Sequence, residues 1–180
     1  MPPVISDSTK PTTVRVAASR LTQALSRLIM KYAKKSLCGP IFEEELDEMI
    51  DSLQESGYLL DDAYLEHIAQ NHGGRPITKY FRHGEIVRFL NFTDSYTASN
   101  ANVRQFNVNV VRNLIKDRIG KNIVPFASLP HGAFLCFDYS TTAVPKIVMW
   151  NNESFSEEYV NVEDSFSDLI NSLSDTPHAA

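Results

Sequence analysis

The chain has 180 residues, of which 43% are hydrophobic and 22% charged, a balance that is ordinary for a globular protein and excludes wholesale disorder. At the usual ~100–200 residues per domain, this length predicts one domain with an appendage at most. No apolar run reaches the ~18 residues of a transmembrane helix, and the N-terminus lacks the basic-then-apolar layout of a secretory signal, so we expect a cytoplasmic protein.

The charges divide the chain into two parts. Residues 1–37 hold seven bases and one acid, a net charge of +6, whereas residues 38–180 hold ten bases and 21 acids, a net charge of −11. Such an acidic body disfavours direct binding to nucleic acid and suits a basic partner protein. The two cysteines, Cys38 and Cys136, are too few for a disulfide framework, and the apolar surroundings of Cys136 predict a buried thiol.

The N-terminal part predicts a tail followed by a helix. Residues 1–13 are rich in Pro, Ser and Thr, which is typical of a flexible tail. Residues 14–37 predict a basic amphipathic helix, because apolar residues recur at spacings of three and four from Val14 to Tyr32. Three interpretations stay open: the apolar seam packs against the body or against its twin in a homodimer, the helix lies on an anionic membrane surface, or it is a mitochondrial presequence.

Two shorter helices are expected next. Residues 41–56 combine an apolar row with a face of acids, which a solvated helix start explains as well as a binding site does. Asp61 or Asp62 then caps a third helix, which ends at Gly73-Gly74.

The second half of the chain predicts mostly strands. Residues 85–92 predict a strand. The apolar residues of 102–119 fit both the spacing of a helix and the alternation of a strand. We predict a helix, because the pattern is long and Gly120 is a suitable residue to end a helix. Further strands are expected over residues 122–127, 134–139, 146–150 and 159–162, before a last helix that Asp164 or Ser165 caps and that runs through Leu173.

The centre of the sheet is expected in residues 131–150. Two apolar runs, 134–139 and 146–150, flank the turn residues 140–145, which predicts an antiparallel pair. Apolar and polar residues hardly alternate in the two runs, which predicts that these strands are buried on both faces of the sheet. Trp150 is expected in the core. Helices before and after a cluster of strands indicate an α+β fold with a mainly antiparallel sheet of about five or six strands.

The sequence offers few converging polar groups for catalysis. His67 and His72 are five residues apart, about 140° around a helix, so they cannot share a metal site on one face. His131, Asp138 and Ser140 could supply a base, an acid and a nucleophile, but no Gly-x-Ser-x-Gly motif surrounds Ser140. We therefore expect no enzyme, no metal and no cofactor, and a structural hydrogen bond from a neighbouring turn to Asp138.

An ordered set of short motifs resembles the SUKH superfamily of bacterial immunity proteins. The motifs are Leu60, Tyr64-Leu65, Asn71-His72-Gly73-Gly74-Arg75-Pro76, Val124-Pro125-Phe126-Ala127, Gly132, Phe137-Asp138-Tyr139, Pro145, Ile147-Val148, Trp150, Ser165-Phe166 and Leu169. The resemblance implies a SUKH-like α+β domain over residues 41–173, after the N-terminal amphipathic helix and before a short tail over residues 174–180.

The same resemblance implies a function without catalysis. It implies an immunity protein that binds and occludes a cognate toxin, delivered by neighbouring bacteria and frequently a nuclease with a basic active face. The acidic body would then steer association, and we expect contacts from acids and an aromatic residue of exposed loops: Asp94, Tyr96, Glu153, Glu157 and Glu158. The alternative is a regulatory protein-interaction scaffold, because the superfamily extends to fungal proteins that coordinate cell-wall signalling.

Overall fold

The computed structural model describes residues 30–39, 41, 43–55, 57–92, 101–152 and 159–179. Within these ranges the helices are α2 (Glu43–Glu55), α3 (Asp62–Gln70), α4 (Ala101–Arg104), α5 (Val108–Ile115), the 3-10 turn η1 (Pro130–Gly132) and α6 (Phe166–Ser172). The strands are β1 (Tyr80–Phe81), β2 (Gly84–Glu85), β3 (Arg88–Phe89), β4 (Ile123–Ser128), β5 (Phe134–Asp138), β6 (Lys146–Trp150) and β7 (Tyr159–Glu163).

The α+β class with a mainly antiparallel sheet is confirmed. Five strands form one antiparallel sheet in the order β3-β4-β5-β6-β7, and β1 and β2 form a separate antiparallel pair. The sequence-predicted hairpin lies at the centre, since β5 pairs with β4 on one side and β6 on the other. Leu135, Cys136 and Phe137 are at most 1% exposed, so consecutive residues of β5 are buried on both faces as expected.

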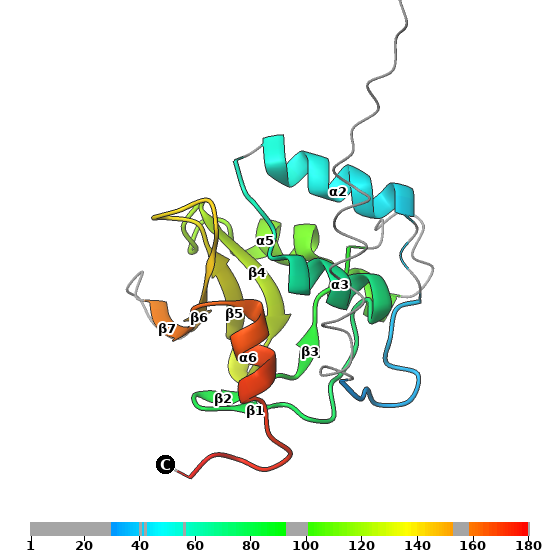
Figure 1. The fold of residues 1–180 in the computed structure, drawn as a ribbon, viewed down its shortest axis with the longest axis vertical. Coiled ribbons are helices and arrows are strands. Elements are labelled where there is room, and N and C mark those ends of the chain that lie inside the picture. Colours follow the sequence, from blue (N-terminus) through cyan, green and yellow to red (C-terminus); the bar gives the residue numbers. More distant parts are fainter. Residues whose placement is uncertain are drawn as a thin grey trace, which may run out of the picture.

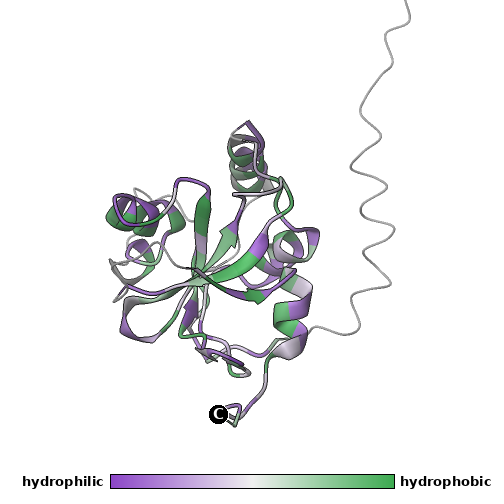
Figure 2. Ribbon diagram, turned by 90° about the vertical axis from the view of Figure 1, so that its left-hand side faces the viewer, coloured by the Kyte–Doolittle hydropathy of each residue, from purple (hydrophilic) through white to green (hydrophobic). Residues whose placement is uncertain are grey.

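Helices cover both faces of this sheet (Figure 1). On one face, Tyr64 of α3 meets the rings of Phe137 and Phe166 at centroid distances of 4.9 and 5.1 Å. On the other face, the guanidinium of Arg118, just after α5, lies 5.5 Å from the ring centroid of Trp150. Figure 2 shows hydrophobic strands at the centre and hydrophilic residues along the outer helices. The core therefore consists of the sheet and the helix sides that pack on its two faces.

Two helix caps that the sequence predicted are present. The Asp61 carboxylate accepts hydrogen bonds from the backbone N–H groups of Ala63 and Tyr64 at 2.8 and 3.2 Å. The Ser165 hydroxyl accepts one from the backbone N–H of Asp168 at 3.1 Å. Each cap satisfies amide groups that the first helical turn leaves unpaired, and so sets where α3 and α6 begin.

Two elements differ from the sequence-based prediction. Residues 85–92 do not form one strand: Glu85 pairs with Tyr80 in the small sheet, whereas Arg88 pairs with Ser128 in the large one. The helix over 102–119 is divided, because the Asn107 side chain accepts hydrogen bonds from two backbone N–H groups and starts α5 as a new helix.

The helix expected over residues 14–37 does not extend into residues 30–37, and residues 14–29 lie outside the described ranges. Tyr32 instead forms an antiparallel bridge with Pro76, and the backbone N–H of Ile77 donates to the carbonyl of Lys31 at 2.8 Å. The ring of Tyr32 lies 6.0 Å from that of His67. These long-range contacts hold Lys31 and Tyr32 against residues 76–77 and beside the Gly73-Gly74 turn. No helix of the described ranges is long and apolar enough to cross a membrane.

Candidate protein-binding surface

The five predicted contact residues lie outside the described part of the chain. Asp94 and Tyr96 fall in residues 93–100, and Glu153, Glu157 and Glu158 fall in residues 153–158. The assignment of these residues to a binding face therefore stays a prediction.

The described acids concentrate on α2. This helix has seven acids and no base in 13 residues, a third of the 21 acids after residue 37. Five of these acids are exposed: Glu44, Asp47, Glu48, Asp51 and Glu55. The sequence showed this run, but its interpretation as a solvated helix start gave no reason to single it out as a binding face.

The apolar row of α2 explains why its acids face solvent. Leu46, Met49, Ile50 and Leu53 recur at spacings of three, one and three, which places them on one side of the helix. All four are half-buried, and Leu46 and Met49 pack against the core. The acids occupy the opposite side, and α2 lies at the outer edge of the fold, beyond α3 from the small sheet (Figure 1).

Among the side chains that the structure describes, no ion pair involves an acid of α2. The ion pairs found there join Lys79 to Glu85 and Lys146 to Asp164. A row of like charges without ion-pair partners projects a negative potential into solvent, which accelerates encounter with a cationic partner and falls off with ionic strength.

Two exposed apolar side chains adjoin the end of α2. The chain turns at Gly57, and the backbone N–H of Leu59 then donates to the carbonyl of Ala143 at 3.2 Å, which brings this segment beside the β5–β6 turn. Leu59 is 47% exposed and Val144 64% exposed. We name these two residues and the five exposed acids of α2 the α2 surface. Apolar area beside charged groups is the composition of many transient protein interfaces.

The rest of the body is not uniformly acidic. Residues 101–121 hold five bases and one acid, and on α5 Leu114 is 82% exposed and Val110 39% exposed. The net charge of the body therefore hides a basic surface around α5 as well as an acidic one on α2. A charge summed over the whole body does not show this separation, although the run of bases is visible in the sequence.

The hydrolytic group considered from the sequence does not assemble. His131 precedes β5 and Asp138 ends it, so a five-residue strand rising about 3.3 Å per residue separates them. The Asp138 carboxylate accepts a hydrogen bond from the backbone N–H of Ser140 at 2.8 Å. The expected structural hydrogen bond to a neighbouring turn is confirmed.

His67 and His72 also serve the fold. Nε2 of His67 lies 2.8 Å from the Tyr32 hydroxyl, and Nε2 of His72 accepts a hydrogen bond from the backbone N–H of Phe92 at 2.8 Å. Both rings are buried, and this burial lowers the pKa of His67 to about 4. Across the described ranges, no three His, Cys, Asp or Glu residues are grouped so that they could hold a metal ion.

The comparison with known families identifies the family of this chain. The family model described as the SMI1/KNR4 family (SUKH-1) matches residues 40–172. A comparison with the curated proteins gives no match. The matched residues make up well over half of the chain and include every helix and strand from α2 to α6. The chain therefore belongs to the SMI1/KNR4 family (SUKH-1).

Proposed function

We propose that this protein is an immunity protein that binds a cognate bacterial toxin and neutralises it by occlusion, without catalysis. Membership of the SMI1/KNR4 family is consistent with an immunity-type protein, and the family is generally a non-catalytic domain of that type. We further propose that the toxin is a basic, nuclease-type effector.

The single observation that carries the choice of a basic toxin is the α2 surface. A nuclease must present bases to the phosphates of its substrate, and those bases are attracted to a row of acids in the same way. The exposed acids of α2 supply the negative potential, and Leu59 and Val144 supply apolar area that excludes water from the contact. A protein docked on those bases blocks nucleic acid from reaching them.

The five loop residues predicted from the sequence remain part of this proposal as a second set of contacts. They are Asp94, Tyr96, Glu153, Glu157 and Glu158. Reversal of their charges, or replacement of Tyr96 by Ala, is expected to weaken binding further if both regions contact the same toxin. Unchanged affinity for the toxin in those variants would show that the loops are not part of the interface. The α2 surface would then be the remaining proposed contact.

The proposal is tested by co-expression with a candidate toxin, for which any toxin-like open reading frame adjacent to the gene is the first choice. Cell survival is scored against the same toxin expressed with an empty vector, and the toxin is then co-purified through a tag on this protein. We expect rescue together with a stable complex of the two proteins. Cell death without a complex would contradict the proposal and favour the regulatory scaffold as the alternative.

A further inference from the structure

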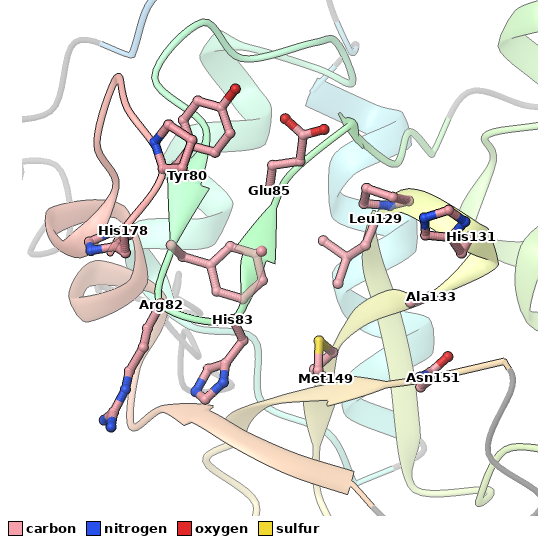
Figure 3. Close-up of a pocket in the computed structure, with 14 residues that line it drawn as sticks. Tyr80, Arg82, His83, Glu85, Leu129, His131, Ala133, Met149, Asn151 and His178 are labelled. Carbon is pink, nitrogen blue, oxygen red and sulfur yellow. The ribbon is translucent and has the colours of Figure 1, made fainter. Parts of the chain in front are cut away.

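A pocket of about 470 Å³ opens at one end of the fold, away from α2. Four segments far apart in the sequence line it: the β1–β2 hairpin, residues 129–133, the end of β6 with Asn151, and residues 177–178. Its volume lies within the roughly 300–1,000 Å³ typical of small-ligand sites. Leu129 and Met149 point into the space between the hairpin and the sheet (Figure 3), so the floor of the pocket is apolar.

The C-terminal segment forms one wall because backbone pairing holds it there. The carbonyl of Ser174 accepts hydrogen bonds from the N–H groups of Lys79 and Tyr80, and its own N–H donates to the carbonyl of Tyr80 at 2.8 Å. The Thr78 hydroxyl donates to the Asp175 carboxylate at 2.6 Å. The tail expected over residues 174–180 is thus anchored at its start, and His178 is brought to the pocket.

Three of the five histidines of the chain line this pocket, namely His83, His131 and His178. They come from three different segments and stand around its rim (Figure 3). The other two histidines are buried in the core. Every exposed histidine of the chain therefore lies at the edge of this one pocket.

The charged groups of the lining favour an anion. Arg82 is exposed and has no ion-pair partner among the described residues. Glu85 is the one carboxylate among the lining residues, and its Oε2 lies 2.5 Å from Nζ of Lys79, which offsets its charge. Although the chain as a whole has a net charge of −5, this pocket presents a guanidinium and three imidazoles. The guanidinium of Arg82 can form the stronger, charge-assisted class of hydrogen bond with a carboxylate.

The backbone at His131 is held in a conformation that non-glycine residues rarely adopt. Its φ of 59° and ψ of 24° lie in the left-handed region, where an L-residue is strained because its Cβ approaches the following carbonyl oxygen. Hydrogen bonds from the N–H of Leu129 to the carbonyl of Ala133 and from the N–H of Ala133 to the carbonyl of Pro130 close this turn. Strain of this kind gathers at ligand sites, and here it places an imidazole on the rim.

We propose that this pocket binds a carboxylate carried on an apolar or aromatic body. The body rests on Leu129 and Met149, and the carboxylate faces Arg82 and His83 of the hairpin. A free aromatic acid and the last residue of a peptide chain share this chemistry. The site is separate from the α2 surface, so the inference stands whether or not the toxin is bound there.

The test uses the full chain labelled with ¹⁵N and two probes that differ only in charge. N-acetylphenylalanine carries the carboxylate, and N-acetylphenylalaninamide has the same ring without it. For ligands of this size we expect a Kd on the order of 1 mM for the acid, with saturable shifts of the amide signals of residues 80–85 and 129–133. The amide should bind at least about fivefold more weakly, as expected for the loss of one charge-assisted hydrogen bond. Equal binding of the two probes, or no saturable shift, would overturn the proposal.

Two variants locate the carboxylate. Arg82→Gln should weaken binding of the acid and leave binding of the amide unchanged. Arg104→Gln is the matched control, because it removes the same charge at an exposed residue outside the pocket. Equal weakening by both variants, or by neither, would overturn the assignment.

Two further probes distinguish the sources of the carboxylate. Tighter binding of benzoate than of a peptide ending in Phe points to a small acid, and the reverse order points to a chain end. Binding of neither overturns the proposal.

Discussion

The hydroxyl oxygen of Tyr32 lies 2.8 Å from Nε2 of His67, and this contact joins a segment upstream of the family-matched residues to α3. Tyr32→Phe removes the hydroxyl and leaves the buried Nε2 of His67 without this hydrogen-bond partner. We therefore expect a loss of about 1–3 kcal/mol in the free energy of unfolding. Urea denaturation measures the loss. The control is Tyr58→Phe, whose hydroxyl bonds the carbonyl of Lys121 at an exposed position and should cost less. Equal losses would show that the buried Tyr32–His67 contact stabilises the fold no more than an exposed hydrogen bond does.

His67 makes stability depend on pH. Burial lowers its pKa to about 4 in the folded protein, against an ordinary value of 6.5. Between these values the unfolded chain binds a proton that the folded protein does not, so stability is lost as the pH falls from 6.5 towards 4. At pH 5 we expect this residue to account for a loss on the order of 2 kcal/mol relative to pH 7.

The measurement is a pair of urea titrations at pH 7 and pH 5. In His67→Gln, which cannot titrate, the loss between the two pH values should shrink by that amount. His83→Gln replaces an exposed ring, so the loss of stability between pH 7 and pH 5 should be the same in this variant as in the unmodified protein. An unchanged loss in His67→Gln would contradict the assignment.

The Gly73 turn packs against residues 30–38 too closely for a side chain. Its φ is +66°, and a Cβ placed there would lie 2.6 Å from the sulfur of Cys38. Gly57 has a similar φ of +82° but nothing within 4 Å of such an atom. We expect Gly57→Ala to cost about 1–2 kcal/mol from the backbone alone. Gly73→Ala should cost more, since Cys38 must also move. Thermal and urea unfolding of the two variants compare them, and similar costs would show that the turn and the segment are not in contact.

Phe137 links the sheet to the helical layer. Its ring stacks on Phe126 at a centroid distance of 4.3 Å, and it is 1% exposed. We expect Phe137→Ala to cost about 3–5 kcal/mol, because a cavity remains where the ring was. Leu114→Ala removes an apolar side chain that is 82% exposed and should change stability by about 0.5 kcal/mol or less. A small cost at Phe137 would mean that the face between the sheet and α3 is not closely packed.

The sequence predicted elements whose signals are local. Asp61 and Ser165 were recognisable as caps, and the apolar runs of β5 and β6 as a buried hairpin, because neither needs knowledge of a distant partner. The break before α5 was also readable, since Asn107 is a strong N-cap residue directly before Val108. The apolar residues of that segment fit both a helix and a strand, and this ambiguity concealed the break before α5.

Features set by long-range contacts could not be predicted in this way. An alternating pattern cannot show that Glu85 pairs with Tyr80 while Arg88 pairs with Ser128. The spacing that placed Tyr32 on a helix cannot show the bridge to Pro76 and the contact with the ring of His67, which hold this segment in a non-helical path. For the same reason, the sequence cannot show that three histidines far apart in the chain line one pocket.

The most direct test of recognition through the α2 surface is the affinity of the purified complex with the toxin. Kd is measured at low and high salt for the unmodified protein, for Asp51→Lys on α2, and for Asp117→Lys, an equal charge change at an exposed residue outside α2. We expect Asp51→Lys to weaken binding by about tenfold or more and Asp117→Lys to have little effect, with affinity falling as salt rises. Equal affinities for the two variants, together with no dependence on salt, would contradict the account.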